Sequence, residues 1–592
     1  MNQTIPRPEY PRPDFIRKDW MNLNGQWSFE IDQGTSGKDR GLFRADAVLK
    51  DSITVPFCPE SKLSGVENRD FLNGVWYQRR FSIPGEWAGR RVLLHFGAVD
   101  YRTQVWVNGK LAGGHIGGFT PFCLDITDYL ENDNLLTVYA EDDPRSQKQP
   151  LGKQCRSYDS KGCDYTRTTG IWQTVWMEPV NPLFITGMKN IPDVKNGILA
   201  LDIAFSGNVS GAVLSVEASF EGESCGTAEF HLTGSSLRGA LTLDKLVLWE
   251  PGKGNLYDLK LTLKKDGEIL DAVDSYFGMR SIEISGQKVL INGKSVFQRL
   301  VLDQGFYPDG IYTAPQADAL KADIELSMSL GFNGARMHQK VFEPYYLYWA
   351  DKLGYLVWGE YGDWGMDLSR YEAVREFLPQ WLESVDRDFN HPAVVGWCPF
   401  NEIQDASKNF CMENGDLVLQ PVQDDDAVRT VFRMTKRVDP TRPVIDVSGF
   451  FHVETDIYDS HCYNRNVEEF KQYFEAFKEG GQPYVSFNYS TTQKYGGQPY
   501  MVSEYGGGFY CPGVELPKEW EPGRFATQQA FMEQYEGLTL AMLDHPNICG
   551  FCYTQLYDVE QEMNGLCTYD RTPKFDVEAI CKINTHKAAI ED

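Results

Sequence analysis

The sequence lacks long apolar runs and an excess of positive charge. No segment approaches the ~18 consecutive apolar residues of a membrane-spanning helix, so no transmembrane helix is predicted. The 57 Lys and Arg residues are outnumbered by 83 Asp and Glu residues, which gives a formal net charge of −26. A surface of that sign repels phosphate groups, which argues against nucleic acid or an anionic membrane as the main partner.

The N-terminus also lacks the apolar core of a secretory signal, since the first 13 residues read MNQTIPRPEYPRP. The 13 cysteines are scattered and odd in number, which predicts reduced thiols and a cytoplasmic location. Cys549 and Cys552 have CxxC spacing, but alternation along an apolar strand would send their sulfurs to opposite faces. We predict no cofactor and no metal site, and we expect the acidic run at 424–426 to begin a helix.

What the chain does have is enough apolar material for several cores. Of its 592 residues, 42% are hydrophobic, and a prior of roughly 150 residues per domain suggests about three or four domains. Residues 1–181 contain short alternating or β-branched runs and an Asn108-Gly109 hairpin turn, which predict a jelly-roll β-sandwich. Residues 182–280 alternate cleanly between turns, as in an immunoglobulin-like β-sandwich.

Residues 281–592 change to a repeating strand–helix pattern. The apolar runs that we interpret as strands are 296–302, 334–337, 355–360, 394–400, 443–447, 457–461, 500–504 and 548–554. Amphipathic stretches such as 317–330, 371–389 and 525–543 lie between them and predict helices. Eight such repeats describe a (β/α)8 TIM barrel, with the weakest repeat between the fifth and sixth strands. A doubly wound sheet is the alternative, but the region has no glycine-rich phosphate loop.

Two glutamates stand where barrel strands end, which is where barrel enzymes carry their chemistry. Glu402 closes the fourth apolar run and Glu504 the seventh. These strands lie on opposite sides of a barrel mouth, so the two carboxyl groups are expected to face each other. This arrangement suits glycoside cleavage, in which one carboxylic acid protonates the leaving oxygen and the other carboxylate attacks the anomeric carbon. A spacing of about 5–5.5 Å is expected if configuration is retained.

These motifs carry a resemblance to a known family. Segments LNGQWSF (23–29), GVWYQRRF (74–81), VWVNG (105–109), TGIWQTVW (169–176), FGMR (277–280), LINGK (290–294), HPAVVGWCPFNE (391–402) and SEYG (503–506) occur in the order typical of glycoside hydrolase family 2. That family comprises β-galactosidases, β-glucuronidases and β-mannosidases. The resemblance covers almost the whole chain and implies a glycosidase with a carbohydrate substrate. Self-association, common in the family, is left open.

The resemblance implies roles for individual residues. Glu402 would be the general acid/base and Glu504 the nucleophile, with Tyr463 holding Glu504 ionised. The Glu504 anion is expected to favour the protonated form of Glu402 until the glycosyl-enzyme forms. Asn401 is placed to bind the sugar 2-hydroxyl. Further candidates for substrate contact are Asp303, Arg336, His338, Trp364, His461, Tyr505, Gln555 and Asp558.

The sequence departs from the family where the glycone would be recognised. Family β-glucuronidases carry an Asn-x-Lys motif that pairs the substrate carboxylate, whereas here Asn564 is present but Leu566 stands in the place of the lysine. Asp558 and Glu560 nearby would repel a uronate. We therefore expect a retaining exo-β-glycosidase for neutral sugars, most simply a β-galactosidase. The alternatives are a β-glucuronidase or galacturonidase that uses Arg336 for the carboxylate and, in another class, a non-catalytic carbohydrate-binding protein.

Overall fold

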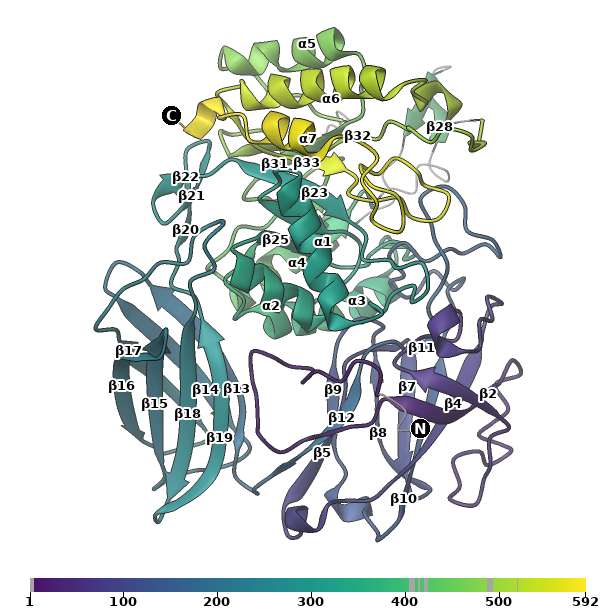
Figure 1. Ribbon diagram of the computed structural model, residues 1–592, viewed down its shortest axis with the longest axis vertical. Coiled ribbons are helices and arrows are strands. Elements are labelled where there is room, and N and C mark those ends of the chain that lie inside the picture. Colours follow the sequence, from purple (N-terminus) through teal and green to yellow (C-terminus); the bar gives the residue numbers. More distant parts are fainter. Residues whose placement is uncertain are drawn as a thin grey trace.

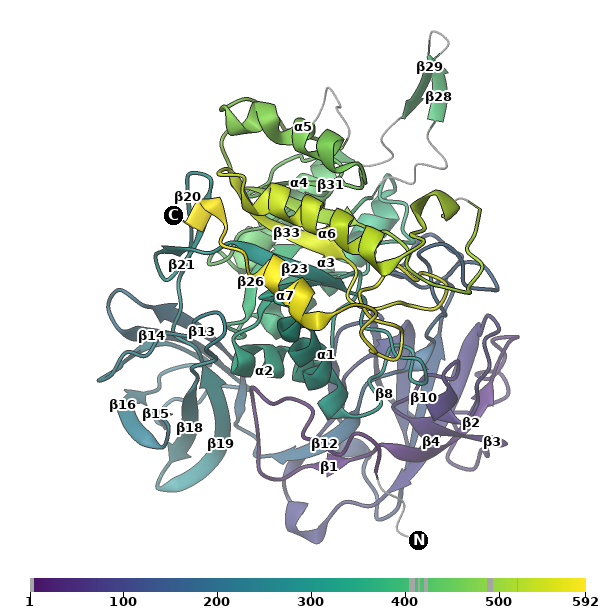
Figure 2. The same ribbon diagram turned by 45° about the horizontal axis from the view of Figure 1, so that its top comes forward.

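The computed structural model describes residues 5–403, 410–413, 416–419, 424–486, 493–518 and 520–591. Two β-rich units lie side by side beneath a mixed α/β unit, which carries the green to yellow part of the chain (Figure 1). The turned view again shows both β units on the same side of the α/β unit (Figure 2). No helix in the described residues is both long and apolar enough to cross a membrane.

The N-terminal unit is a two-sheet sandwich. Its strands are β1 (Met21–Asn22), β2 (Gly25–Ile31), β3 (Asp51–Val55), β4 (Gly74–Phe81), β5 (Arg91–Phe96), β6 (Val99–Asp100), β7 (Arg102–Val107), β8 (Lys110–Ile116), β9 (Phe122–Asp125), β10 (Asn134–Glu141), β11 (Gly170–Ile171) and β12 (Val175–Val180). One sheet has the order β1-β12-β5-β9 and the other β3-β2-β4-β10-β7-β8. Asn108 and Gly109 both have positive φ, 53° and 77°, and join β7 to β8. The predicted hairpin is confirmed.

The middle unit is a second, smaller sandwich. Its strands are β13 (Ile185–Asp193), β14 (Ile198–Phe205), β15 (Val213–Phe220), β16 (Glu223–His231), β17 (Ser236–Thr242), β18 (Tyr257–Lys265) and β19 (Glu268–Phe277). They form the sheets β13-β14-β17 and β16-β15-β18-β19. Alternate residues such as Leu199, Leu214 and Leu261 meet in the core between the sheets. This is the immunoglobulin-like packing that the alternation predicts.

The C-terminal unit is the predicted barrel. Its β elements are β20 (Ile282–Ser285), β21 (Lys288–Ile291), β22 (Lys294–Ser295), β23 (Gln298–Asp303), β24 (Gly334–Met337), β25 (Leu356–Glu360), β26 (Val394–Cys398), β27 (Phe400–Asn401), β28 (Phe410–Glu413), β29 (Asp416–Leu419), β30 (Val447–Ser448), β31 (Tyr458–Cys462), β32 (Tyr500–Gly506) and β33 (Ile548–Thr554). Seven of them form a curled parallel sheet in the order β26-β25-β24-β23-β33-β32-β31. The residues of these seven strands are buried, as expected for a parallel sheet covered by helices.

The helices cover the outside of the barrel. They are α1 (Ala317–Ser329), α2 (Pro344–Leu353), α3 (Tyr371–Asp388), α4 (Asp425–Val438), α5 (Val467–Lys478), α6 (Gln528–Leu543) and α7 (Val577–Asn584). Two 3-10 helices, η4 (Glu521–Gly523) and η5 (Ala589–Glu591), also belong to this unit, whereas η1 (Lys62–Ser64), η2 (Gly85–Trp87) and η3 (Thr127–Tyr129) belong to the N-terminal sandwich. Asp424 caps α4, so the acidic run begins a helix as predicted. The hairpin β28–β29 projects from the barrel (Figure 2).

The fifth strand is shorter than predicted. Val444 bridges Trp397, and β30 pairs in parallel with β27, so two short pairings join the fifth segment to the fourth. The Asp446 carboxylate accepts the backbone amides of Val447 and Val453, which removes these donors from a continuous ladder. Side-chain capping of the backbone therefore interrupts the strand expected at 443–447.

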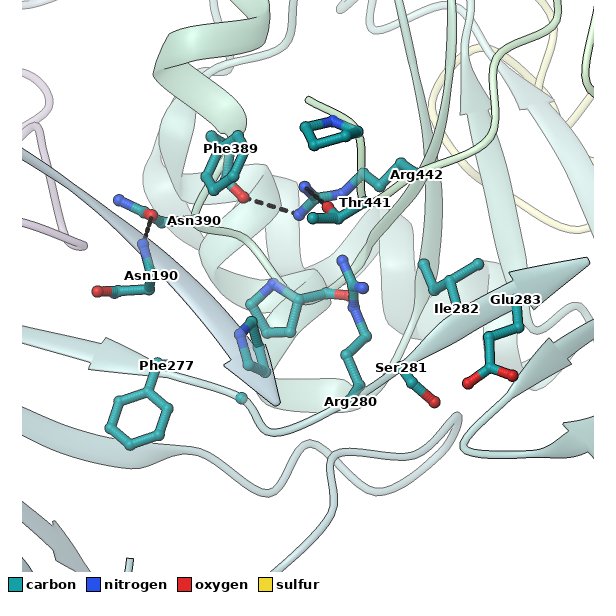
Figure 3. Close-up of a pocket in the computed structure, with 14 residues that line it drawn as sticks. Asn190, Phe277, Arg280, Ser281, Ile282, Glu283, Phe389, Asn390, Thr441 and Arg442 are labelled. Carbon is teal, nitrogen blue, oxygen red and sulfur yellow. Dashed lines mark hydrogen bonds between the residues drawn. The ribbon is translucent and has the colours of Figure 1, made fainter. Parts of the chain in front are cut away.

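Two buried arginines lie where the middle sandwich meets the base of the barrel, and Arg280 joins the two units. Arg280 donates to the carbonyls of Pro392 and Val394, at 2.5 and 2.7 Å. Arg442 donates to the carbonyl of Phe389 at 2.7 Å. Both line a cavity of about 260 Å³ between the units (Figure 3). The cavity lies at the junction of the folds and contains none of the predicted site residues.

Candidate active site

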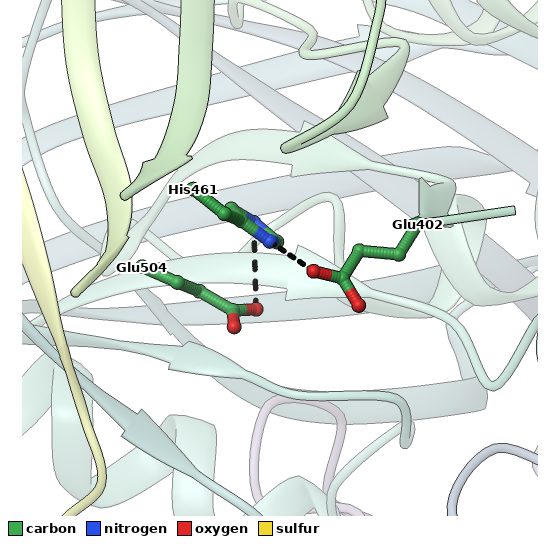
Figure 4. Close-up of side chains that lie close together, drawn as sticks. All are labelled: Glu402, His461 and Glu504. Atoms are coloured by element: carbon green, nitrogen blue, oxygen red, sulfur yellow. Dashed lines mark hydrogen bonds and ion pairs between the residues drawn. The ribbon is translucent and has the colours of Figure 1, made fainter. Parts of the chain in front are cut away.

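Three side chains from different strands meet at the mouth of the barrel. Glu402 follows β27, His461 belongs to β31, and Glu504 to β32. The His461 ring lies between the two carboxyl groups, with Nδ1 2.5 Å from Glu402 and Nε2 3.5 Å from Glu504 (Figure 4). One carboxylate oxygen of each glutamate and a ring nitrogen all lie within 4.8 Å of one another.

This spacing has a chemical consequence. An inverting glycosidase holds its carboxyl groups roughly 6.5–9.5 Å apart to admit a water, whereas a retaining one needs about 5–5.5 Å. Carboxylate oxygens within 4.8 Å of each other match the retaining spacing and fall short of the inverting one. The pair therefore has the geometry of cleavage through a covalent glycosyl-enzyme.

Glu504 is held as an anion. Arg336 donates to one carboxylate oxygen at 3.1 Å, and the Tyr463 hydroxyl donates to the other. Burial alone would raise the pKa of Glu504, but the positive charges of His461 and Arg336 and the Tyr463 hydroxyl lower it below its ordinary value. A carboxylate that stays ionised and oriented is suited to nucleophilic attack. The expected contact between Tyr463 and Glu504 is present.

Arg336 is the centre of a buried network. Besides Glu504, its guanidinium donates to Glu360 at 2.5 Å and to Asn401 Oδ1 at 2.8 Å. Glu360 also accepts from His338 Nδ1 at 3.0 Å. Glu360 was missing from the predicted site residues, although it ends the third apolar run and that position was its only signal. All Arg336 nitrogens that face the site are engaged, so Arg336 orients carboxylates of the protein and is not free for a substrate carboxylate.

Glu402 sits in an unusual backbone conformation beside a charged histidine. Its φ is 45°, a left-handed value that strains the backbone of a non-glycine residue. Burial lowers the pKa of His461, but the carboxylates of Glu504 and Glu402 raise it above its ordinary value. The Glu402 side chain is 20% exposed, so it remains open to the mouth. The His461 contact gives it a partner with which to exchange a proton.

Two further predicted residues present groups that the protein leaves unpaired. The Asn401 Nδ2 is buried without a hydrogen-bond partner among the described residues, while its Oδ1 is held by Arg336. His338 donates from Nδ1 to Glu360. Burial is the main reason why the pKa of His338 lies well below its ordinary value, so the ring is neutral and its Nε2 is an acceptor. A buried donor and an acceptor beside the glutamates suit sugar hydroxyls. Trp364 lies next to them and donates from Nε1 to the Asn401 carbonyl at 2.7 Å.

Four predicted substrate contacts face elsewhere. Tyr505 follows Glu504 on β32, so alternation turns it outward, where it is fully buried and bonds Thr539 of α6 at 2.8 Å. Asp303 is 1% exposed, and its carboxylate accepts from Gly305, Tyr346 and Tyr557. Gln555 bonds Gln304 and Asn564, and Asp558 bonds Lys574 and the Gly565 amide. These side chains stabilise the loops behind the mouth, since their polar groups are already paired within the protein.

The cluster of Glu402, His461 and Glu504 has donor types that could hold a metal ion. Arg336 and Tyr463 already occupy the Glu504 oxygens, and a divalent cation would have to displace that arginine. The donor set is therefore better suited to proton transfer than to coordination.

A parallel barrel that faces two glutamates at this spacing is built to cleave glycosidic bonds, and the protein is a retaining glycoside hydrolase. Three family models match in chain order. "Glycosyl hydrolases family 2, sugar binding domain" matches residues 20–177, "Glycosyl hydrolases family 2" residues 190–280, and "Glycosyl hydrolases family 2, TIM barrel domain" residues 282–587. The chain belongs to glycoside hydrolase family 2.

Similar proteins differ in the glycone that their names give. A β-glucuronidase of Paenibacillus borealis is 24% identical over 86% of this chain and 87% of its own length. A β-galactosidase of Thermoanaerobacter pseudethanolicus is 26% identical over 56% of this chain and 45% of its own length. The structure of a β-glucuronidase from Ruminococcus gnavus in complex with D-glucuronic acid has the same fold, with a TM-score of 0.78 and 20% identity over 98% of this chain and 100% of that one.

Proposed function

We propose that this protein is a retaining exo-β-glycosidase that releases a β-linked uronic acid, with D-glucuronic acid as the leading candidate. The observation that carries the glycone is the similarity to β-glucuronidases along most of the chain: the relatives from Paenibacillus borealis and Mus musculus align over 86% and 87% of it. The neutral-sugar glycone favoured by the sequence becomes the second candidate.

The reaction follows from the two glutamates. Glu402 gives its proton to the glycosidic oxygen while Glu504 attacks the anomeric carbon, so the aglycone leaves and a covalent glycosyl-enzyme forms. Glu402, now a carboxylate, takes a proton from water, and the resulting hydroxide attacks the anomeric carbon from the vacated face. Glu504 is released and the sugar leaves with its original configuration. Asn401 Nδ2 and His338 Nε2 are the groups proposed to bind glycone hydroxyls.

The sequence argument against a uronate weakens in the folded protein. Asp558 is paired with Lys574 at 2.6 Å, which neutralises its charge. Glu560 accepts the backbone amide of Thr166 at 3.1 Å and is thereby turned toward the N-terminal sandwich. Neither carboxylate is a free anion facing the mouth.

A β-galactosidase remains the second candidate for a specific reason. Leu566 occupies the position of the family's lysine and is 1% exposed, so the barrel itself offers no cation there. The β-galactosidase relative from Thermoanaerobacter pseudethanolicus is consistent with this reading.

A panel of p-nitrophenyl glycosides separates the two candidates. We expect the highest kcat/KM on the β-D-glucuronide or β-D-galacturonide, and lower values on the β-D-galactoside and α-L-arabinoside. Glu504→Gln should abolish release from every substrate while sugar binding persists. A preference for the galactoside would overturn the uronide proposal, and full activity of the Glu504→Gln protein would overturn the site.

A further inference from the structure

A lysine of the N-terminal sandwich enters the barrel mouth. Lys153 lies in the segment between β10 and β11, and it is only 5% exposed. Its ammonium nitrogen stands 4.0 Å from the centroid of the Trp364 ring. Trp364 in turn donates to the carbonyl of Asn401, the residue before Glu402. A different domain thus brings the lysine to the barrel mouth, where the Trp364 ring links it to Asn401.

The segment that carries Lys153 is fixed to the barrel. The amide of Leu151 donates to the Trp364 carbonyl at 2.8 Å, and the amide of Gly152 donates to the Gly362 carbonyl at 2.9 Å. Gly152 has a φ of +60°, and a Cβ there would come within 2.1 Å of the Gln339 carbonyl oxygen. Such a close approach of two backbones requires glycine and leaves Lys153 little freedom.

Within the described residues the partner found for the Lys153 ammonium group is the face of the Trp364 ring, and no salt bridge joins it to a carboxylate. Burial lowers the pKa of Lys153, but the nearby Cys163, Glu562, Glu504 and Asp164 raise it above its ordinary value, so the lysine is charged. A buried cation without a bonded partner is unfavourable, and a carboxylate brought by a ligand would supply that partner.

Three other cations near the mouth are already in use. Arg336 is engaged by Glu360, Glu504 and Asn401. Lys340 donates to the carbonyls of Gly305 and Tyr312, at 2.5 and 2.8 Å. Lys574 pairs with Asp558. Asn564, the residue left from the family's motif, is held by Gln555 and Glu562. Lys153 is the remaining buried cation of this group.

We propose that Lys153 binds the carboxylate of the uronic acid glycone and so determines specificity in place of the lysine that Leu566 replaces in the barrel. This inference rests on the proposed uronidase function. It also names a recognition element outside the barrel, so substrate choice depends on the docking of the N-terminal sandwich.

The test compares Lys153→Met with wild type on paired substrates. A lost contact to a buried charge should lower kcat/KM on p-nitrophenyl β-D-glucuronide by at least about 30-fold, chiefly through KM. Turnover of the neutral β-D-galactoside, measured on the same preparation, should change by less than about threefold. Lys153→Arg should recover part of the uronide activity. Lys148→Met is the matched control, because Lys148 is an exposed lysine of the same segment, and it should behave as wild type.

A second measurement removes the substrate's charge. The methyl ester of the p-nitrophenyl glucuronide should be a poor substrate for wild type, while Lys153→Met should no longer distinguish ester from acid. This comparison holds even if Lys153→Met folds poorly, because each ratio is taken within one preparation.

The outcomes separate the two proposals. If wild type cleaves the glucuronide and Lys153→Met loses both substrates equally, with the acidic limb of both pH profiles displaced, then the lysine only tunes Glu504 and this inference is wrong while the uronidase stands. Unchanged uronide kinetics in Lys153→Met would overturn it in the same way. If wild type cleaves only neutral glycosides, the uronidase proposal itself fails and this inference falls with it.

Discussion

At the scale of single residues, the site depends on the different partners of its two glutamates. Glu504 is held as an anion, whereas Glu402 contacts a histidine. Arg336 and the Tyr463 hydroxyl each bind one oxygen of Glu504. Glu402 has only the His461 ring as a side-chain partner in the described residues. The same chemical group therefore does two jobs because its surroundings differ.

Tyr463→Phe should make the enzyme less active in acid. The hydroxyl favours the ionised form of Glu504, whose pKa is depressed although burial alone would raise it. Losing the hydroxyl raises that pKa, so the acidic limb of kcat/KM should move to higher pH by roughly one to two units. A pH profile of both proteins measures the shift. An unmoved limb would mean that Tyr463 does not act on Glu504.

Glu402→Gln should affect substrates according to their leaving groups. An aglycone that leaves as a poor anion, such as methanol, needs the proton from Glu402, so its release should fall by about 10²–10⁴-fold. Formation of the glycosyl-enzyme from the p-nitrophenyl glycoside should fall much less, because p-nitrophenolate leaves without protonation. Pre-steady-state kinetics on both substrates measures this. An equal loss on both would argue that Glu402 is not the acid.

At the scale of elements, the sequence predicted best where packing determines structure. The run 548–554 was predicted as a strand and is β33, because every residue in it is buried and apolar material is needed on both faces. The fifth strand was predicted too long, because the effect of the Asp446 carboxylate on the backbone depends on a fold that the run itself does not specify.

Tyr505 and Asp303 were placed at strand ends correctly, but the direction in which they point depends on register. Lys153 gave no signal, since its neighbours in space belong to another domain.

Gly152→Ala should destabilise the contact between the lysine-bearing segment and the barrel. The added methyl group meets the Gln339 carbonyl oxygen at 2.1 Å, in addition to the strain of a φ of +60°. Gly162→Ala is the matched control, since its φ is +59° but nothing lies within 4 Å of the added carbon. Backbone strain should lower the stability of both variants by roughly 1–3 kcal/mol, and the stability of Gly152→Ala should fall further because of the clash. Thermal unfolding measures the difference, and equal losses would mean that the close approach is relaxed without cost.

At the scale of the whole molecule, a buried arginine holds the two sandwiches together. Arg17 donates to Glu178 of β12 at 2.8 Å and to Asp271 of β19 at 2.9 Å. Burial would raise the pKa of Glu178, but His95, Arg12 and Arg17 lower it to about 2. Its stabilising effect is therefore present above the unfolded pKa of about 4.3 and is lost as the pH falls toward about 2.

Arg17→Met should reveal the strength of this junction. Removing the arginine leaves two buried carboxylates without their shared cation, which costs about 3–5 kcal/mol. Arg238→Met removes an exposed pair with Asp202, whose arginine is 88% exposed, and should cost less than about 1 kcal/mol. Denaturant unfolding at pH 7 measures both. A small loss in Arg17→Met would show that the sandwiches are held by their apolar contacts instead.

The backbone contact between Gly152 and the barrel holds Lys153, the proposed carboxylate-binding residue of the N-terminal sandwich, at the barrel mouth. The two glutamates and their network belong to the barrel, whereas Lys153, the residue proposed to bind the sugar carboxylate, belongs to a separate domain. New substrate preferences can then arise in evolution by exchanging one loop of that sandwich, with the catalytic strands left untouched. By the same logic, an excised barrel would lose discrimination between sugars before it lost the chemistry itself.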